Sequence, residues 1–295
     1  NVDAIIMRMP DRNSGASLNC KDLYADYVKS NSFEKTMIRC LQSLIPYLER
    51  DDEIDIQKIM NWEEVKEIIV PELVCTRRAG ENLEDLIYRN VEGTDLAIIY
   101  RVKQQVANIV GSIKVSKQMM EAWGVDENRI HEFAFHNMNQ LSTLQIVELN
   151  SDFAMPEETF SELPEKMNKY SSYVFTNKEA FYGAATIMEE GMLHSIAERL
   201  QEGFYLLPMD VDNIVVYPEG MMKNLESIHS MVLIHNIQCL EPENYLSDQV
   251  YYYSKEKEEL SMSTNPENTQ DVIIKILQQA MECSPGKKED YGEER

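Results

Sequence analysis

The stretch from residue 170 to 254 constrains the fold more than any other part of this sequence. Its apolar, aromatic and β-branched runs have the composition typical of strands, and they occupy residues 172–176, 204–207, 214–217 and 249–254. Residues 183–200 carry apolar side chains four positions apart, and a second helical stripe begins at Leu225. The order β-α-β-β-α-β predicts an α+β two-layer sandwich of the split βαβ type, with helices on one side of a mainly antiparallel sheet.

The N-terminal half is predicted to be a mainly helical region with a small antiparallel sheet. Residues 21–50 follow a helical period, and 61–69 form a capped helical segment that Pro71 interrupts. Strands are expected at 86–91, 95–102 and 108–115. Ser116 is expected to cap a helix that Gly124 ends, and a longer helix follows.

Composition shifts predict four segments along the chain. Residues 139–170 combine polar side chains, Pro156, Pro164 and an acidic run, so we place the domain boundary there. The predicted segments are a mixed helical and β region at 1–150, a linker at 151–170, an α+β domain at 171–262, and a terminal helix with a disordered tail at 263–295.

The charge balance excludes some partners. The 295 residues include 51 Asp and Glu against 28 Lys and Arg, which gives a net charge of -23. Such a surface repels phosphate backbones and anionic membranes, so we expect neither nucleic-acid nor membrane binding. The ordinary interpretation of this net charge is an acidic, soluble surface. The functional alternative is that the negative charge attracts cations or a basic partner.

Cysteine usage and the apolar runs indicate a cytoplasmic protein. Five scattered cysteines without a C-x-x-C pair form neither a disulfide framework nor a zinc site. No apolar stretch approaches the roughly 20 residues that cross a bilayer. The chain begins at Asn1 without a methionine, which is compatible with a removed leader.

Two sets of ionisable residues at regular spacing are candidates for metal or acid-base sites. His131 and His136 are five residues apart, so on a helix they point about 140° away from each other, unlike the zincin pair. Glu190, His194 and Glu198 share one helical stripe, which could hold a cation. That stripe lies opposite the apolar face, so a solvated surface explains it better.

The strongest remaining candidates for a cation site lie in the turn after Pro208. Asp210 and Asp212 form a D-x-D pair that could chelate a cation, although turn chemistry explains them equally well. His229 and His235 flank the second apolar stripe and are expected to be partly buried and hydrogen-bonded. Ser247 is expected to be a turn residue, and residues 251–253 (YYY) a half-buried strand.

Several blocks of sequence resemble, in order, those of one bacterial family. They include 62–65 (WEEV), 94–100 (TDLAIIY), 119–124 (MMEAWG), 204–208 (FYLLP) and 245–251 (YLSDQVY). The family is domain of unknown function 5688, found in gut Clostridia, and the resemblance implies a cytoplasmic bacterial protein with no established activity. After Pro208 the family continues with hydroxyl residues and a His-Glu pair, whereas this chain has 209–213 (MDVDN).

No constellation of residues predicts a reaction, so we assign no catalytic, cofactor-binding or metal residue and expect no cofactor. We expect a non-enzymatic protein that binds a protein partner or a small ligand. The alternative is a cation-dependent hydrolase that uses Asp210 and Asp212, or the stripe of Glu190, His194 and Glu198.

Overall fold

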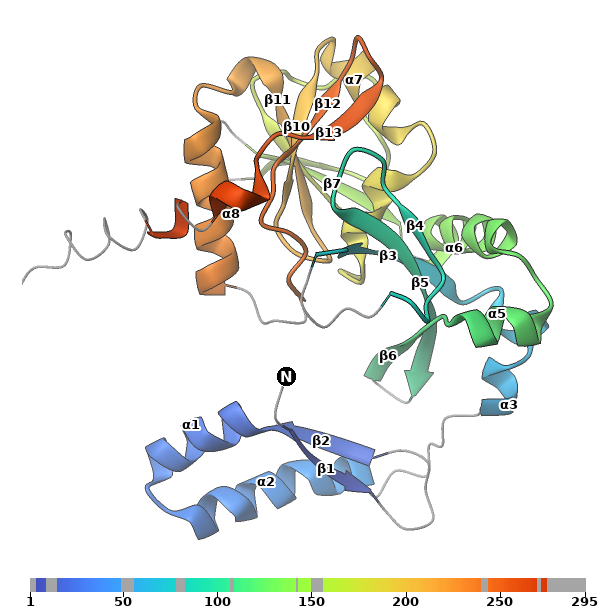
Figure 1. Ribbon diagram of the computed structural model, residues 1–295, viewed down its shortest axis with the longest axis vertical. Helices are drawn as coiled ribbons and strands as arrows, with labels where there is room; N and C mark the ends of the chain where they lie inside the picture. Colours follow the sequence, from blue (N-terminus) through green and yellow to red (C-terminus); the bar gives the residue numbers. More distant parts are fainter. Residues whose placement is uncertain are drawn as a thin grey trace, which may run out of the picture. The chain divides into compact units, whose positions relative to one another are not determined.

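The computed structural model describes residues 4–8, 15–48, 56–77, 83–106, 109–141, 143–149, 156–239, 244–269 and 272–274 (Figure 1). The chain forms two compact units. One comprises Asn1–Lys66 with Val102–Ile113, and the other Glu67–Arg101 with Lys114–Arg295. Most of the terminal helix and tail predicted for 263–295 lies outside the described residues.

The first unit begins with a β-hairpin and two helices. Strands β1 (Ala4–Arg8) and β2 (Gly15–Asn19) pair antiparallel, and α1 (Cys20–Ser30) and α2 (Phe33–Leu48) follow. The hydroxyls of Ser30 and Thr36 lie 2.8 Å apart and link the ends of the two helices. Two short helices, α3 (Ile56–Ile59) and α4 (Trp62–Val65), complete this part, with Asn61 capping α4 as predicted.

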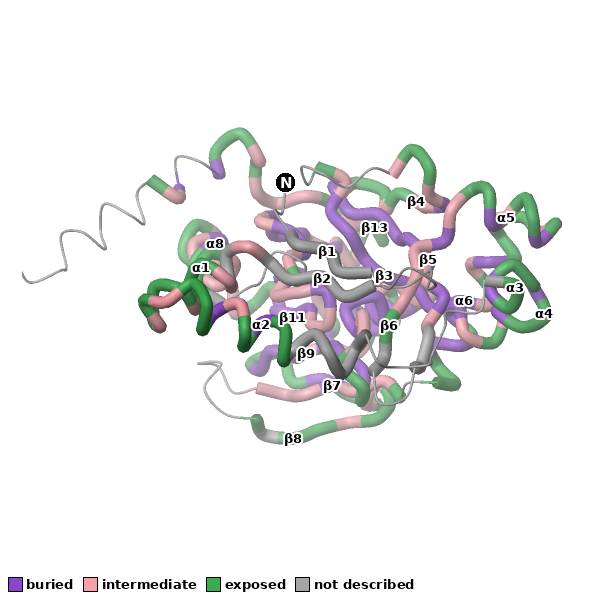
Figure 2. Tube along the Cα trace, turned by 90° about the horizontal axis from the view of Figure 1, so that it is seen from below, coloured by how far each residue is buried: buried purple, intermediate pink, exposed green. Residues whose placement is uncertain are grey.

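A four-stranded sheet contains β3 (Ile69–Cys75), β5 (Leu96–Val106) and β4 (Tyr88–Asn90) in that order, with β6 (Ile109–Lys114) also paired to β5. All seven residues of β3 are buried (Figure 2). The helical continuation expected up to residue 69 is therefore wrong at its end. Pro71 fits inside β3 because this is an edge strand, where a missing N–H is tolerated.

Two helices follow the four-stranded sheet. Ser116 caps α5 (Lys117–Trp123), and Gly124 ends it in the left-handed conformation, as predicted. The next helix, α6 (Glu127–Leu141), packs on β3, where the buried Asn137 side chain donates to the Ile69 carbonyl at 2.8 Å.

The larger sheet has seven strands in the order β13-β12-β10-β11-β9-β7-β8, and every neighbouring pair is antiparallel. The strands are β7 (Leu144–Leu149), β8 (Pro156–Phe160), β9 (Ser172–Asn177), β10 (Phe204–Pro208), β11 (Ile214–Pro218), β12 (Tyr251–Ser254) and β13 (Glu259–Met262). Between them lie η1 (Gly183–Met188), α7 (Met192–Leu200), η2 (Glu219–Met221) and α8 (Leu225–Cys239). The predicted β-α-β-β-α-β order and the α+β class are confirmed.

The two helices of this motif cover opposite faces of the sheet. Val232 of α8 packs with Leu207 and Val215, which are paired neighbours on one face. On the other face, Tyr253 lines a hollow together with Leu193 of α7. The expectation of helices on one side is wrong because of the direction of the two βαβ connections, from β9 past β11 to β10 and from β11 past β10 to β12. The two connections run in the same lateral direction between strands of opposite polarity, and right-handed crossovers then place their helices on opposite faces.

The boundaries of the two compact units differ from the boundaries of the four predicted segments. Residues 151–170, expected to be a linker, include β8, which pairs with β7 at the edge of the large sheet. Both strands lie in the same unit as residues 171–262. The sequence signal is weak because residues 157–159 of β8 (EET) are polar and the strand lacks the alternation of a half-buried strand.

Candidate functional site

The stripe of Glu190, His194 and Glu198 lies on the surface. All three side chains are exposed. His194 Nδ1 lies 3.3 Å from the Glu258 carboxylate, and Lys255 Nζ lies 3.2 Å from that of Glu198. His194 and Glu198 of α7 therefore contact the β12–β13 hairpin, and exposed contacts of this kind contribute little energy, while Glu190 precedes the helix.

Asp210 and Asp212 organise a turn. The Asp210 carboxylate accepts hydrogen bonds from the Asp212 backbone N–H and the Asn213 side chain, both at 2.8 Å. Asp212 accepts from the Tyr182 N–H at 2.6 Å and so fixes the start of η1. Burial raises the pKa of Asp212, and the hydrogen bond from Tyr182 opposes this shift. The Asp210 carboxylate therefore stabilises the turn, and the Asp212 carboxylate stabilises the start of η1.

The structure does not bring His131 and His136 together. His131 Nδ1 lies 2.9 Å from the Tyr100 hydroxyl, and burial lowers the pKa of this histidine, whereas His136 is exposed. Across the part of the chain that the structure describes, no three His, Cys, Asp or Glu side chains gather closely enough to hold a metal ion.

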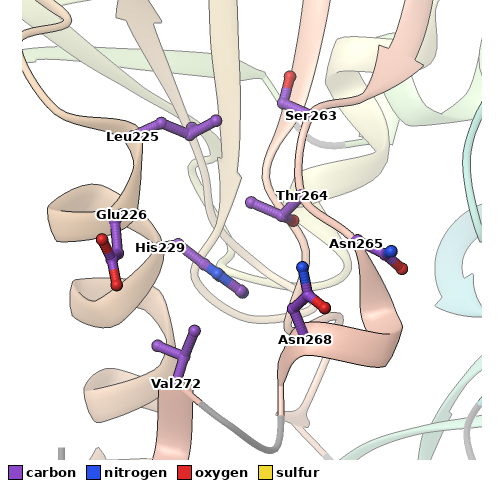
Figure 3. Close-up of a pocket in the computed structure, with 8 residues that line it drawn as sticks. All are labelled: Leu225, Glu226, His229, Ser263, Thr264, Asn265, Asn268 and Val272. Atoms are coloured by element: carbon purple, nitrogen blue, oxygen red, sulfur yellow. The ribbon is translucent and has the colours of Figure 1, made fainter. Parts of the chain in front are cut away.

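A pocket of about 520 Å³ lies between α8 and the chain that follows β13 (Figure 3). Its lining residues are Leu225, Glu226 and His229 from α8, Ser263, Thr264, Asn265 and Asn268 from residues 263–268, and Val272. In Figure 3, Leu225 and His229 extend from α8 toward the facing segment, Thr264 extends back toward the helix, and Asn268 lies below Thr264 on the facing segment. Ser263 and Asn265 point away from the pocket.

Local hydrogen bonds hold both sides of the pocket. The Asn224 side chain caps α8 by accepting from the Glu226 N–H at 2.9 Å. Across the pocket, the Thr264 hydroxyl accepts from the Val250 N–H at 3.0 Å and donates to the Gln249 side chain at 2.8 Å. The segment then continues as η4 (Pro266–Asn268), whose N-cap is Asn265. The side chains therefore occupy defined positions.

Among the described residues that line this pocket, His229 is the buried ionisable group, with 4% of its surface exposed. Its Nε2 lies 2.9 Å from the Asp248 backbone carbonyl. Because a carbonyl only accepts, Nε2 must carry the hydrogen. Burial lowers the pKa of His229, and the hydrogen bond to the Asp248 carbonyl opposes this shift. Because Nε2 carries the hydrogen, the neutral ring has its lone pair on Nδ1. Nδ1 makes no hydrogen bond to any described residue, which leaves an acceptor for a ligand.

The loop behind His229 is fixed by α8. The Asn236 side chain donates to the Ser247 carbonyl at 3.0 Å and to the Asp248 carboxylate at 2.8 Å. The prediction that His235 is hydrogen-bonded is wrong for its Nε2 atom, which is buried without a partner among the described residues. The loop that orients His229 is therefore anchored at two points.

A buried polar cluster adjoins this loop. The Tyr251 hydroxyl lies 2.6 Å from the Asp95 carboxylate and 2.7 Å from the Ser247 hydroxyl, and all three residues are buried. The Cys75 thiol donates to Asp95 at 3.6 Å. Burial and the adjacent carboxylate raise the pKa of Tyr251 well above its ordinary value, so its hydroxyl stays protonated. The cluster joins β12 to the start of β5.

Sequence reasoning found neither the pocket nor the cluster. Residues 263–295 are predicted only as a terminal helix and a disordered tail, although Asn265 followed by Pro266 is a recognisable helix start. The cluster joins Asp95 and Tyr251, which are 156 positions apart. Only the pairing of the strands brings such residues together, and no local spacing signals it.

Together the fold and the pocket define an α+β protein with one helix wall and one loop wall around a polar cavity. Residues 1–255 match the family of unknown function DUF5688, and the chain belongs to this family. The α8 wall lies within the matched region, and the facing segment follows it. No curated protein and no solved structure matches the chain. None of the described helices combines the length and apolar character needed to span a bilayer.

Proposed function

We propose that this chain is a non-enzymatic binding protein that holds a small polar ligand between α8 and the segment formed by residues 263–268 with Val272. The observation that carries the proposal is the buried His229 imidazole, whose tautomer is fixed by Asp248 and whose Nδ1 acceptor is unused. The pocket volume of about 520 Å³ falls in the range of about 300–1,000 Å³ typical of small-molecule sites.

The lining favours recognition over catalysis. Nucleophilic catalysis needs a hydroxyl or thiol within hydrogen-bond reach of a base. The Thr264 hydroxyl already makes two hydrogen bonds to the protein, and Ser263 points away from the pocket (Figure 3). A neutral imidazole, a carboxamide and a carboxylate remain, and these groups orient a ligand.

A cytoplasmic setting forms part of the proposal. Cys20, Cys40 and Cys75 are not joined in disulfide bonds, which fits a reducing compartment. The net charge of -23 argues against nucleic acid as the partner.

A library of small polar molecules tests the proposal by ligand-observed NMR. Leu225→Trp places an indole where the Leu225 side chain enters the pocket, so it should abolish binding of every specific hit. Ile237→Trp is the matched control, because it adds the same side chain to an exposed position of the same helix. If no compound binds, or if both variants bind every hit as the wild type does, the proposal is wrong.

A further inference from the structure

A hollow of about 480 Å³ lies between α7, the turn that joins β4 to β5, and the β12–β13 hairpin. This α7 hollow shares no described lining residue with the α8 pocket, the cavity around His229. We infer that the α7 hollow is a binding site for a guanidinium group carried on a short aliphatic stem. The inference concerns a second site and goes beyond the function proposed above.

The backbone holds the walls of the α7 hollow together. The Met262 N–H of β13 donates to the Gly93 carbonyl at 2.9 Å, so the β4–β5 turn lies directly against β13 (Figure 1). A Cβ at position 93 would collide with the Leu260 carbonyl oxygen. Glycine permits this close approach, and it adopts the φ of +75° found here without strain. The two walls are therefore held in a defined arrangement.

Tyr253 carries an unused hydroxyl at the floor of the α7 hollow. Its ring stacks on Phe204 with centroids 5.3 Å apart, and only 4% of the residue is exposed. Burial raises the pKa of Tyr253 and the charge of Glu258 raises it further. Because Glu258 also lines the hollow, the hydroxyl end of the ring faces it. This hydroxyl bonds to no described residue, and since buried hydroxyls are normally hydrogen-bonded, it indicates a ligand.

Three carboxylates line the same hollow from two walls. Glu92 belongs to the β4–β5 turn, and Glu258 and Glu259 belong to the β12–β13 hairpin. The Glu258 carboxylate lies 3.3 Å from His194 Nδ1. Those of Glu92 and Glu259 make no hydrogen bond or ion pair to any described residue. Because no three such side chains among the described residues gather closely enough for a metal ion, the arrangement favours a cation with donors on several sides.

A guanidinium group matches this set of acceptors. It is planar, permanently charged and carries five N–H donors in a fixed fork, whereas an ammonium carries three donors on one atom. One guanidinium can therefore bond carboxylates of both walls and the phenol oxygen together. Val91, Leu193 and Leu260 offer apolar surface to a stem of a few methylenes. The net charge of -23 also raises the local concentration of cations.

Four probes test the inference by NMR titration of the full chain at pH 7.5 and low salt: butylguanidinium, butylammonium, butan-1-ol and pentanoate. We expect butylguanidinium to shift the Gly93 amide resonance and to bind at least about tenfold more tightly than butan-1-ol, because its contacts are charge-assisted. Butylammonium should bind about threefold more weakly than butylguanidinium, and pentanoate most weakly. Equally tight binding of any other probe, or the same Gly93 shift with Ca²⁺ alone, would contradict the inference.

Two variants each remove one acceptor from the hollow. Tyr253→Phe should weaken butylguanidinium about fivefold, and Glu92→Gln about tenfold. The matched controls are Tyr252→Phe, whose hydroxyl donates to Glu219 at 2.8 Å, and Glu256→Gln, at an exposed position of the same hairpin. Both controls should bind as the wild type does. An equal loss in a variant and its control would overturn the inference.

Thermal melts confirm that each variant folds, and Glu92→Gln with its control decides the matter if Tyr253→Phe does not fold. A blocked peptide, acetyl-Gly-Arg-Gly-amide, distinguishes the source of the guanidinium. Tighter binding than butylguanidinium assigns the hollow to an arginine of a partner protein, and weaker binding assigns it to a free small molecule.

Leu225→Trp separates this inference from the proposed function. It fills the α8 pocket, so it should leave the affinity for butylguanidinium unchanged. If Leu225→Trp abolishes that binding, the probe occupies the α8 pocket and the inference about the α7 hollow is wrong, while the proposed function stands. If no guanidinium compound binds the wild type, the inference is also wrong, and the α8 pocket keeps its own test.

Discussion

Replacing Tyr251 by phenylalanine should destabilise the fold by removing one oxygen from the buried cluster. The ring of Tyr251 is fully buried, and phenylalanine keeps its packing. The lost hydroxyl lies 2.6 Å from the Asp95 carboxylate and 2.7 Å from Ser247 Oγ. Because a carboxylate only accepts, the tyrosine hydrogen goes to Asp95, and Ser247 supplies the hydrogen of the second bond.

The magnitude follows from these two hydrogen bonds. A hydrogen bond to a charged group contributes about 1.5–3 kcal/mol, and a neutral one contributes about 0.5–1.5 kcal/mol. Asp95 stays buried and keeps the Cys75 thiol at 3.6 Å, which is a weak donor. We therefore expect Tyr251→Phe to lower the free energy of unfolding by about 2–4 kcal/mol.

Urea unfolding at pH 7 with an unchanged m-value measures this loss. Tyr253→Phe is the matched control on the same strand and face, because no described residue makes a hydrogen bond to its hydroxyl; it should cost under about 0.5 kcal/mol. Equal losses in the two variants would refute the role assigned to the Asp95 cluster.

Three further outcomes follow from the structure. Arg101→Met should cost about 3–5 kcal/mol in urea unfolding because it leaves the buried Glu72 carboxylate without its guanidinium, and a loss below about 1 kcal/mol would contradict this. Gly93→Ala should lower the thermal midpoint, since its φ is +75° and a Cβ would lie 2.1 Å from the Leu260 carbonyl oxygen; an unchanged midpoint would refute that contact. Burial lowers the pKa of His229, so its contribution to stability is present above about pH 6.5 and lost as the pH falls through the folded value. The drop in unfolding free energy between pH 7.5 and 5.5 should therefore be smaller in His229→Gln, and identical drops would be evidence against a lowered pKa.

The sequence predicts the parts of the fold that have local signals. Ser116 and Gly124 bound α5 because a side-chain cap and a left-handed glycine act within one turn. The strands of the β-α-β-β-α-β stretch are evident from composition, yet their order and the faces covered by α7 and α8 depend on pairing between distant strands. Strand β8 was missed because an exposed edge strand needs no apolar alternation.

The candidate site was less predictable. The sequence predicts His229 only as a partly buried, hydrogen-bonded histidine beside an apolar stripe, and its tautomer depends on a carbonyl 19 residues away. Asp210 and Asp212 looked like ligands because their spacing suits a cation, but the same spacing suits the turn that they form. A pocket needs two surfaces, and the one formed by residues 263–268 carries no spacing that links it to α8.

The protonation and tautomer of the His229 ring test the proposed binding site most directly. The ¹⁵N spectrum of histidine-labelled protein at pH 7 distinguishes the two neutral tautomers and the imidazolium. We predict a neutral ring with hydrogen on Nε2, and an Nδ1 resonance that moves when the tightest pocket ligand is added. An imidazolium, a hydrogen on Nδ1, or an Nδ1 resonance unchanged at saturating ligand would contradict the proposal that His229 Nδ1 accepts a hydrogen bond from the ligand.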